Sequence, residues 1–286
     1  METKLLKPYG YCLGVINAIN LAKKVRKDFP TSNVYIFGHL VHNELVTIEL
    51  EKLNINSLDV DNPIKMLNNF KKDDIVIFTA HGHDEKYDEI LSSNGVKFFD
   101  ATCTKVKDNN KLIKSNLDKG VIYIGVKGHE ETNAALSISS DIVLYDIKSG
   151  IDYSLVKGDE PIVVNQTTLS IVGLKGIYED IKTHLPKARF VDEICDATRR
   201  RQQTLLEEAP NFDLIVVVGS LTSSNTNKLV QIAESSNSKA RIIRVNKLED
   251  FNNVENINQY HKALVTSGTS TPLSLIEDVV KYLEEI

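Results

Sequence analysis

Short apolar runs and amphipathic stretches alternate along almost the whole of this 286-residue chain. The apolar runs are rich in Val, Ile and Tyr and continuous rather than alternating, which is typical of parallel strands buried on both faces. They occupy residues 33–38, 74–80, 121–126, 141–146, 161–165, 213–219 and 262–267. Helical patterns lie between them, as at 14–27, 43–53 and 226–236. This order predicts an α/β fold with mainly parallel sheets.

The only three cysteines divide the chain at nearly equal intervals. Cys103 follows Cys12 by 91 residues, and Cys195 follows Cys103 by 92. The last two end similar segments, KFFDATC and RFVDEIC, each interpreted as a strand that ends at Asp and leads to the cysteine. The segment before Cys12, LKPYGYC, lacks the Phe and the Asp. The spacing predicts three quasi-equivalent α/β units at 13–102, 103–194 and 195–286, the last joined by the N-terminal segment 1–12.

The composition excludes several classes of protein. A formal net charge of −5 argues against a nucleic-acid binder with a broad basic surface. No apolar stretch approaches the roughly 18 residues of a membrane helix. The N-terminus has the features of neither a signal peptide nor a transit peptide, so we expect a cytoplasmic protein, with a monomer as the default. Three cysteines are too few for a secreted disulfide framework.

Polar side chains gather where the expected strands end, which is the edge where open α/β sheets bind ligands. Any one cluster is explained as well by capping of the next helix. Five of the seven histidines also lie there, however, and capping does not require them. The polar residues are His39, His42, Asn43, His81, His83, His129, Glu131, Gln166, Thr167, Thr168, Ser223, Ser224, Asn225, Asn227, Thr269 and Ser270. With helix N-termini they favour a phosphate or diphosphate ligand, and no P-loop or dinucleotide motif is present.

The cysteines predict a metal centre if the three units meet around an axis. A single cysteine is more often an inert buried side chain. Three thiolates around an axis would bind zinc with one open position, or an iron–sulfur cluster in which one iron lacks a protein ligand. Such an iron activates a substrate oxygen as a Lewis acid. Beside an anion pocket, it predicts a reductase that acts on an oxygenated phosphate ester.

Nine spaced motifs resemble those of the 4-hydroxy-3-methylbut-2-enyl diphosphate reductases, the LytB (IspH) family. The resemblance runs from residue 5 to about 280 and includes all three cysteines. The motifs are YGYCLGV (9–15), VHN (41–43), TAHG (79–82), DATC (100–103), GHEE (128–131), QTTLS (166–170), EIC (193–195), SSNTNKL (223–229) and SGTSTP (267–272).

The resemblance implies a trefoil of three α/β units around one [4Fe–4S] cluster held by Cys12, Cys103 and Cys195. The implied reaction is reductive dehydroxylation of the substrate to isopentenyl and dimethylallyl diphosphate, the terminal step of the non-mevalonate isoprenoid pathway. The substrate hydroxyl would bind the open iron, and a flavodoxin or ferredoxin would supply electrons.

The resemblance also implies the roles of the remaining site residues. Glu131 would deliver protons, helped by Thr167 beside the substrate hydroxyl and by His129. The diphosphate ligands would be His42, His81, His129, Thr168, Ser223, Ser224, Asn225 and Ser270. A carboxyl in a closed pocket beside a diphosphate should have a raised pKa, as an acid catalyst requires.

The chain departs from the family pattern in three places. Thr104 stands where the family has Pro, and Arg200 stands where Asn is common. The family segment H-P-E-V-x-G is HEETNA here, at 129–134. None of these changes removes a residue with an implied role.

Two other functions stay open on the sequence. One is a zinc or cysteine-dependent hydrolase with Cys103 as nucleophile and His81 or His129 as base, which iron content would exclude. The other is a non-catalytic cluster protein that senses redox state or a diphosphate metabolite. A sensor would retain its function in Glu131→Gln, whereas a reductase would keep its cluster and lose turnover.

Overall fold

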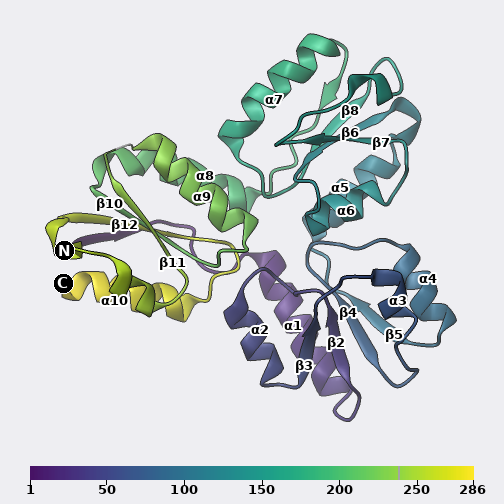
Figure 1. Cartoon of the computed structure of the whole chain (residues 1–286), viewed down its shortest axis with the longest axis horizontal. Coiled ribbons are helices and arrows are strands. Elements are labelled where there is room, and N and C mark those ends of the chain that lie inside the picture. Colours follow the sequence, from purple (N-terminus) through teal and green to yellow (C-terminus); the bar gives the residue numbers. More distant parts are fainter. Residues whose placement is uncertain (238) are drawn as a thin grey trace.

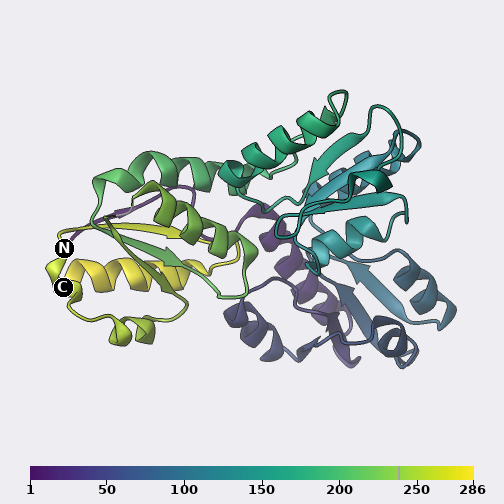
Figure 2. The ribbon, with the colours of Figure 1, turned by 45° about the horizontal axis from the view of Figure 1, so that its top comes forward.

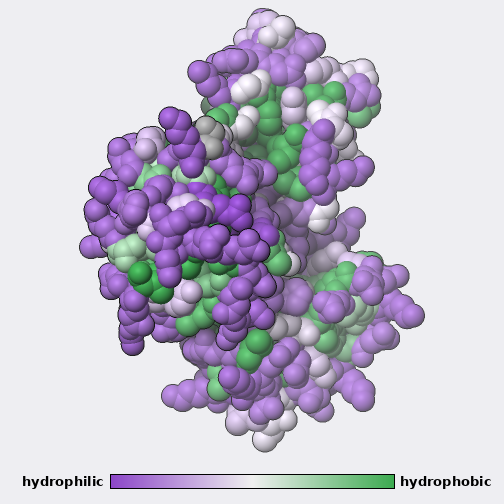
Figure 3. Space-filling view, turned by 60° about the vertical axis from the view of Figure 1, so that its left-hand side comes forward, coloured by the Kyte–Doolittle hydropathy of each residue, from purple (hydrophilic) through white to green (hydrophobic). Residues whose placement is uncertain are grey.

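The computed structural model describes residues 1–237 and 239–286 and contains three separate four-stranded sheets, each entirely parallel. Figures 1 and 2 show three lobes, one per sheet, with helix α1 (purple) at the centre where the lobes meet. The predicted α/β class and trefoil arrangement are confirmed. On the face in Figure 3, hydrophilic residues cover most of the surface and hydrophobic residues appear mainly beside the hollows between lobes.

The first sheet has the strand order β3-β2-β4-β5. Its strands are β2 (Val34–Phe37), β3 (Ile55–Leu58), β4 (Ile75–Phe78) and β5 (Lys97–Asp100), with helices α1 (Leu13–Asp28), α2 (Glu44–Glu51), α3 (Pro63–Leu67) and α4 (Lys86–Ser93). The second sheet has the equivalent order β7-β6-β8-β9. It comprises β6 (Val121–Gly125), β7 (Ile142–Asp146), β8 (Ile162–Asn165) and β9 (Arg189–Phe190), with α5 (Thr104–Lys114), α6 (Glu130–Leu136) and α7 (Ile171–His184).

The third sheet is completed by the N-terminus of the chain. Strand β1 pairs with β12 in a register that joins Glu2 to Lys262, so β1 takes the place that β5 and β9 hold in the other sheets. The order is β1-β12-β10-β11. The elements are β1 (Glu2–Leu5), β10 (Leu214–Val218), β11 (Arg241–Val245) and β12 (Lys262–Ser267), with α8 (Asp196–Glu208), α9 (Ser224–Ser236) and α10 (Leu273–Glu285).

Each cysteine marks the point where the chain leaves one sheet and begins a helix on the next. Cys12, Cys103 and Cys195 are the N-cap residues of α1, α5 and α8. These helices pack through apolar residues on the first, second and third sheets respectively. The unit boundaries at 13–102, 103–194 and 195–286 stay a prediction that is compatible with this packing.

The three cysteines also occupy equivalent backbone positions. The amide N–H of each cysteine donates to a carbonyl two residues beyond the end of β12, β4 or β8. The acceptors are Thr269 for Cys12, Ala80 for Cys103 and Thr167 for Cys195, at 3.0–3.1 Å. The chain therefore repeats its geometry closely enough to bring the cysteines to one centre.

The seven strands predicted from apolar runs are all present, with ends that differ by no more than two residues. The predicted helices lie at α1, α2 and α9. The expectation that the strand before Cys195 ends at Asp is wrong, because β9 ends at Phe190 and the Asp192 side chain accepts from the N–H of Ile194, which turns the chain. No helix in the part of the chain that the structure describes has the length and apolar character to cross a membrane.

Candidate functional site

A cavity at the centre of the trefoil brings together residues from all three sheets. All thirteen residues to which the sequence assigned a role line it. They are Cys12, His42, His81, Cys103, His129, Glu131, Thr167, Thr168, Cys195, Ser223, Ser224, Asn225 and Ser270. The cavity lies at the carboxyl ends of the parallel strands, as expected for this class of fold.

The threefold repeat explains how such distant residues meet. Loops after β2, β6 and β10 carry His42, His129 and Ser223, which lie at or beside the N-cap of the following helix. Loops after β4, β8 and β12 carry His81 in the first sheet, Thr167 and Thr168 in the second, and Ser270 in the third.

The cysteine thiols face a space whose shape depends on Gly14. A β-carbon at Gly14 would lie 2.6 Å from Sγ of Cys103 and 3.8 Å from Sγ of Cys12, so a side chain there would fill the space between the two thiols. The thiol of Cys195 donates to Oγ1 of Thr198 at 3.0 Å. All three cysteines are free and half-buried. This donor set fits a metal centre with three thiolate ligands.

Electrostatics at the cysteines favour thiolates only if a cation joins them. Burial raises the pKa values of Cys103 and Cys195, and the neighbouring Cys12 raises both further. Backbone N–H groups at the start of α5 act in the opposite direction on Cys103. A metal ion removes this penalty because it neutralises the thiolates. The same raised pKa values disfavour a free nucleophilic thiolate, which the hydrolase alternative requires.

Among the described residues, Glu131 is the acid that lines the cavity, and 2% of its surface is exposed. One oxygen, Oε1, accepts from the N–H of Thr167 at 2.8 Å, and Oε2 accepts from Oγ1 of the same residue at 2.9 Å. Oε1 also lies 3.4 Å from the hydroxyl of the fully buried Tyr123. Burial raises the pKa of Glu131, and the hydrogen bonds from Thr167 oppose this increase without cancelling it. The carboxyl is thus held in place and prepared to carry a proton.

Three imidazoles line the cavity. The rings of His42 and His81 are stacked with centroids 4.3 Å apart, and His129 meets them edge-on at 5.7 and 5.9 Å. Burial, followed by the neighbouring histidines, lowers the pKa of His42 to about 4 and that of His129 to about 3. Both rings are therefore neutral at pH 7.

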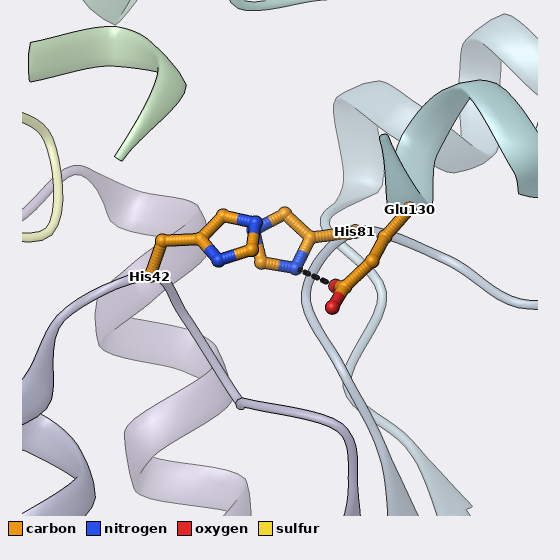
Figure 4. A group of neighbouring side chains, drawn as sticks. All are labelled: His42, His81 and Glu130. Carbon is orange, nitrogen blue, oxygen red and sulfur yellow. Dashed lines mark ion pairs between the residues drawn. The ribbon is translucent and has the colours of Figure 1, made fainter. Parts of the chain in front are cut away.

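Nδ1 of His81 is 2.6 Å from Oε2 of Glu130, as Figure 4 shows. Although burial opposes it, the hydrogen bond to His81 and the charge of that ring lower the pKa of Glu130 to about 2. Ligand atoms of His42, His81 and Glu130 lie within 4.8 Å of one another, the spacing of a cation site. Nδ1 of His81 and Oε2 of Glu130 are already in direct contact, so an ion pair describes this group better.

Comparisons with known proteins agree with this geometry. The family model described as LytB protein matches residues 3–284. The chain belongs to the LytB family. Its relatives include the 4-hydroxy-3-methylbut-2-enyl diphosphate reductases of Bacillus licheniformis, 36% identical over all of this chain and 91% of the relative, and of Malacoplasma penetrans, 35% identical over all of this chain and 98% of the relative.

A solved structure also matches this LytB chain over nearly its full length. The E-1-hydroxy-2-methyl-but-2-enyl-4-diphosphate reductase from Plasmodium falciparum has a TM-score of 0.86 and 27% identity, and the match covers 98% of this chain and 87% of that one. A second reductase structure, 24% identical with a TM-score of 0.67, supports the fold alone.

Two histidines that the sequence placed among the anion donors lie outside the cavity of this LytB protein. His39 is exposed and faces Asp59 at 3.4 Å. His83 stacks on Phe78 with ring centroids 3.7 Å apart, and its Nε2 bonds Asp88 at 2.9 Å. The expectation that five histidines face the ligand is therefore wrong for these two, because neighbours in the first sheet bind them.

Four residues near the LytB site were not identified from sequence. Lys105 and Thr198 line the cavity from the first turns of α5 and α8, at positions +2 and +3 from a cysteine. Tyr123 and Glu130 contact Glu131 and His81 respectively. Lys105 and Thr198 could have been predicted from the sequence, because each lies in the first turn of the helix that follows a cysteine.

The three departures from the LytB pattern have different surroundings. Thr104 is the first residue of α5, directly after Cys103. Arg200 does not line the cavity and pairs with Asp196 on the exposed side of α8 at 2.8 Å. Glu130, at the position of the family's Pro, lies against the imidazole group.

Proposed function

We propose that this chain reduces 4-hydroxy-3-methylbut-2-enyl diphosphate to isopentenyl and dimethylallyl diphosphate, the terminal step of the non-mevalonate isoprenoid pathway. The observation that carries the proposal is that three thiols, a buried protonatable carboxyl and a set of anion donors line one cavity. The activity named for the relatives supports the same reaction.

Cys12, Cys103 and Cys195 would hold one [4Fe–4S] cluster. Bound there, the cluster would supply reducing electrons and a Lewis-acidic iron that lacks a fourth protein ligand. The space beside Gly14 and the helix N-termini that begin at the three cysteines support this assignment, since backbone N–H groups stabilise the negative charge of thiolates.

Glu131 supplies protons to the substrate. The reaction consumes two electrons and two protons, breaks one C–O bond and releases the hydroxyl oxygen as water. The raised pKa of Glu131, caused by burial, keeps a proton available, while Thr167 fixes both carboxyl oxygens. Thr167 would lie beside the substrate hydroxyl, and the ring of His129 would complete the proton path.

The substrate diphosphate would lie among the imidazoles and the hydroxyl and amide donors of the third sheet. The proposed ligands are His42, His81, His129, Thr168, Ser223, Ser224, Asn225 and Ser270. Ser224 and Asn225 open α9, whose N-terminal dipole favours an anion. Transfer of electrons from a flavodoxin or ferredoxin, the monomeric state and the cytoplasmic location stay predictions from the sequence.

Iron, acid-labile sulfide and zinc in anaerobically purified protein test the proposal. We expect about four iron and four sulfide per chain. The loaded protein should then form both diphosphate products from the substrate with a chemical reductant. Zinc without sulfide after cluster reconstitution would overturn the proposal and favour hydrolytic chemistry. A loaded cluster without turnover would favour a sensor.

A further inference from the structure

Three consecutive arginines lie in the first two turns of α8, and only the third is buried. Arg199 pairs with Asp192 at 2.5 Å, and Arg200 pairs with Asp196 at 2.8 Å on the exposed side of the helix. Arg201 is 3% exposed, and the proposed reaction gives it no role. Because a guanidinium stays charged in folded proteins, Arg201 brings a positive charge into the interior.

The hydrogen bonds of Arg201 go to two backbone carbonyls beside cysteines. Its Nη2 donates to the carbonyl of Gly10 at 2.6 Å, and its Nη1 donates to the carbonyl of Ala197 at 2.9 Å. Gly10 precedes Cys12 by two residues, and Ala197 follows Cys195 by two residues. The guanidinium therefore contacts both of the segments that carry these two cysteines.

The charge of Arg201 has no anionic partner among the described residues. No carboxylate there lies within ion-pair distance of the guanidinium, and its Nε–H has no acceptor. Carbonyls carry only partial charges, so a buried cation in such surroundings is unfavourable until an anion lies nearby. Burial accordingly lowers the pKa of Arg201, and negative charge on Cys12 and Cys195 opposes this decrease. Lys105, by contrast, lines the cavity and is neutralised by Glu193 at 2.5 Å.

The threefold repeat shows that the fold does not require a charge at this position. Arg201 stands six residues after its cysteine, and the same offset from the other two cysteines leads to Ala18 and Asn109. Both are buried, with 1% of their surfaces exposed. Ala18 packs in the apolar core of the first lobe, and Asn109 donates to the carbonyl of Asn165 at 3.0 Å. Small or neutral side chains thus suffice in two of the three equivalent places.

We propose that Arg201 is a fixed countercharge for the cluster held by the three cysteines, and that it makes reduction of that cluster more favourable. The inference rests on the proposed function of the cavity. Three thiolates make the bound cluster anionic, and an added electron increases its negative charge. A cation held nearby in surroundings of low dielectric constant offsets that charge. Arg201 does not line the cavity, so it influences the substrate only through the cluster.

The midpoint potential of the cluster-loaded protein tests the role of Arg201. Anaerobic titration with dithionite and redox mediators, followed by electron paramagnetic resonance without substrate, would give this potential for the wild-type protein and for Arg201→Gln. Loss of the cation should make the reduced state at least about tenfold less favourable, which lowers the potential by about 59 mV for one electron. Iron and sulfide per chain, measured beforehand, would show whether the two proteins carry the same cluster.

Three further variants separate charge from structure. Arg201→Lys keeps the positive charge but loses the planar group of donors, and it should keep the wild-type potential. Arg201→Met is a second neutral variant and should reproduce the potential of Arg201→Gln. Arg200→Gln removes the adjacent arginine, whose side chain is 67% exposed, and should leave the potential unchanged because water and salt screen an exposed charge.

Equal potentials in the wild type and the two neutral variants would overturn the proposal. A potential of Arg201→Lys that matches that of Arg201→Gln would also overturn it, because hydrogen-bond geometry at Gly10 rather than charge would then set the value. If the neutral variants bind no cluster while Arg201→Lys binds one, the cluster requires the charge and the proposal stands. Loss of the cluster from Arg201→Lys as well would leave Arg201 a merely structural contact.

Failure of the proposed function would look different. Wild-type protein that binds no iron and sulfide would overturn the proposed function and this inference together. Wild-type protein that carries the cluster and reduces the substrate, but has the same potential as Arg201→Gln, would overturn the inference alone.

Discussion

The first and second sheets differ from the third in the chemistry they bring to the same cavity. Loops and helix starts of the first two contribute three imidazoles and one carboxyl group, from His42, His81, His129 and Glu131. Loops and the start of α9 in the third contribute the neutral donors Ser223, Ser224, Asn225 and Ser270. The backbone geometry repeats three times, so only side chains create this difference. The pH dependence of the site should therefore originate in the first two lobes.

The cysteines do not share this difference between the lobes, because one cysteine lies at each lobe boundary. A ligand shared equally by three similar units needs three equivalent residues, and the repeat provides them at the N-caps of α1, α5 and α8. The rest of the cavity has no such requirement, so its loops have diverged. The following predictions test the contrast, from the largest expected effect to the smallest.

Among substitutions in the first two lobes, which carry the titratable side chains, Glu131→Gln should lower turnover the most. The amide keeps the size of the side chain but carries no acidic proton, so steady-state turnover should fall by about 10²- to 10⁴-fold. Iron and sulfide content should stay at the wild-type level, as elemental analysis would verify. Glu130→Gln, the adjacent matched change, should retain most of its kcat at pH 7. Turnover above about a tenth of wild type in Glu131→Gln would contradict the assigned role.

Gly14→Ala should impair the cluster site at the three cysteines. A β-carbon 2.6 Å from Sγ of Cys103 forces the thiol to move, so iron per chain should fall by more than about twofold. The control is Gly176→Ala in α7, where no atom lies within 4 Å of the new methyl group and iron should be unchanged. Equal iron in the two variants, both folded by circular dichroism, would argue against a cluster at these cysteines.

Ser224→Ala should test the contribution of the neutral donors in the third lobe. Loss of a hydroxyl that opens α9 should raise KM for the substrate by about five- to tenfold, by the same factor at pH 6 and pH 8, with kcat almost unchanged. Ser235→Ala, later in the same helix, should leave KM unchanged. A change in KM that varies with pH for Ser224→Ala would contradict the expectation that the third lobe contributes no pH dependence.

Proton uptake should accompany binding of inorganic diphosphate at pH 6. The bound anion raises the low pKa values of His42 and His129, which are about 4 and 3 in the free protein. Protons therefore bind together with the ligand, and Kd increases as pH rises. Calorimetry in buffers of different ionisation enthalpy would give an uptake of less than about one proton. His42→Asn should take up fewer protons, with the ligand's own titration common to both. Equal uptake in the two proteins would exclude His42 from the diphosphate site.

The strands missed from sequence share one property, which is their position at sheet edges. The strands β3 and β11 contain polar or charged residues, and β1 lies in a segment with no continuous apolar run. Central strands such as β10, with five consecutive buried residues, produce the apolar runs that can be recognised. An edge strand needs only one buried face and a partner for its backbone, and neither requirement leaves a strong local pattern.

Side-chain direction limited the sequence analysis of the site in the same way. His81 and His83 are separated by one residue after the same strand, yet only His81 lines the cavity. Glu130 and Glu131 are adjacent, and one pairs with His81 while the other bonds Thr167. The backbone conformation of loops and helix starts decides such cases, and it depends on the neighbouring lobe as much as on local sequence.

The sequence by itself determined the α/β class, the threefold repeat, the cysteine positions and the set of polar residues at strand ends, because these follow from hydrophobic patterning and from residue types at fixed spacing. The tertiary structure alone decided that β1 completes the third sheet, 260 residues from its partner in register, and that Glu130 reaches His81 in another lobe. Contacts of this kind join segments whose patterns are independent of each other, and only packing of the complete chain brings them together.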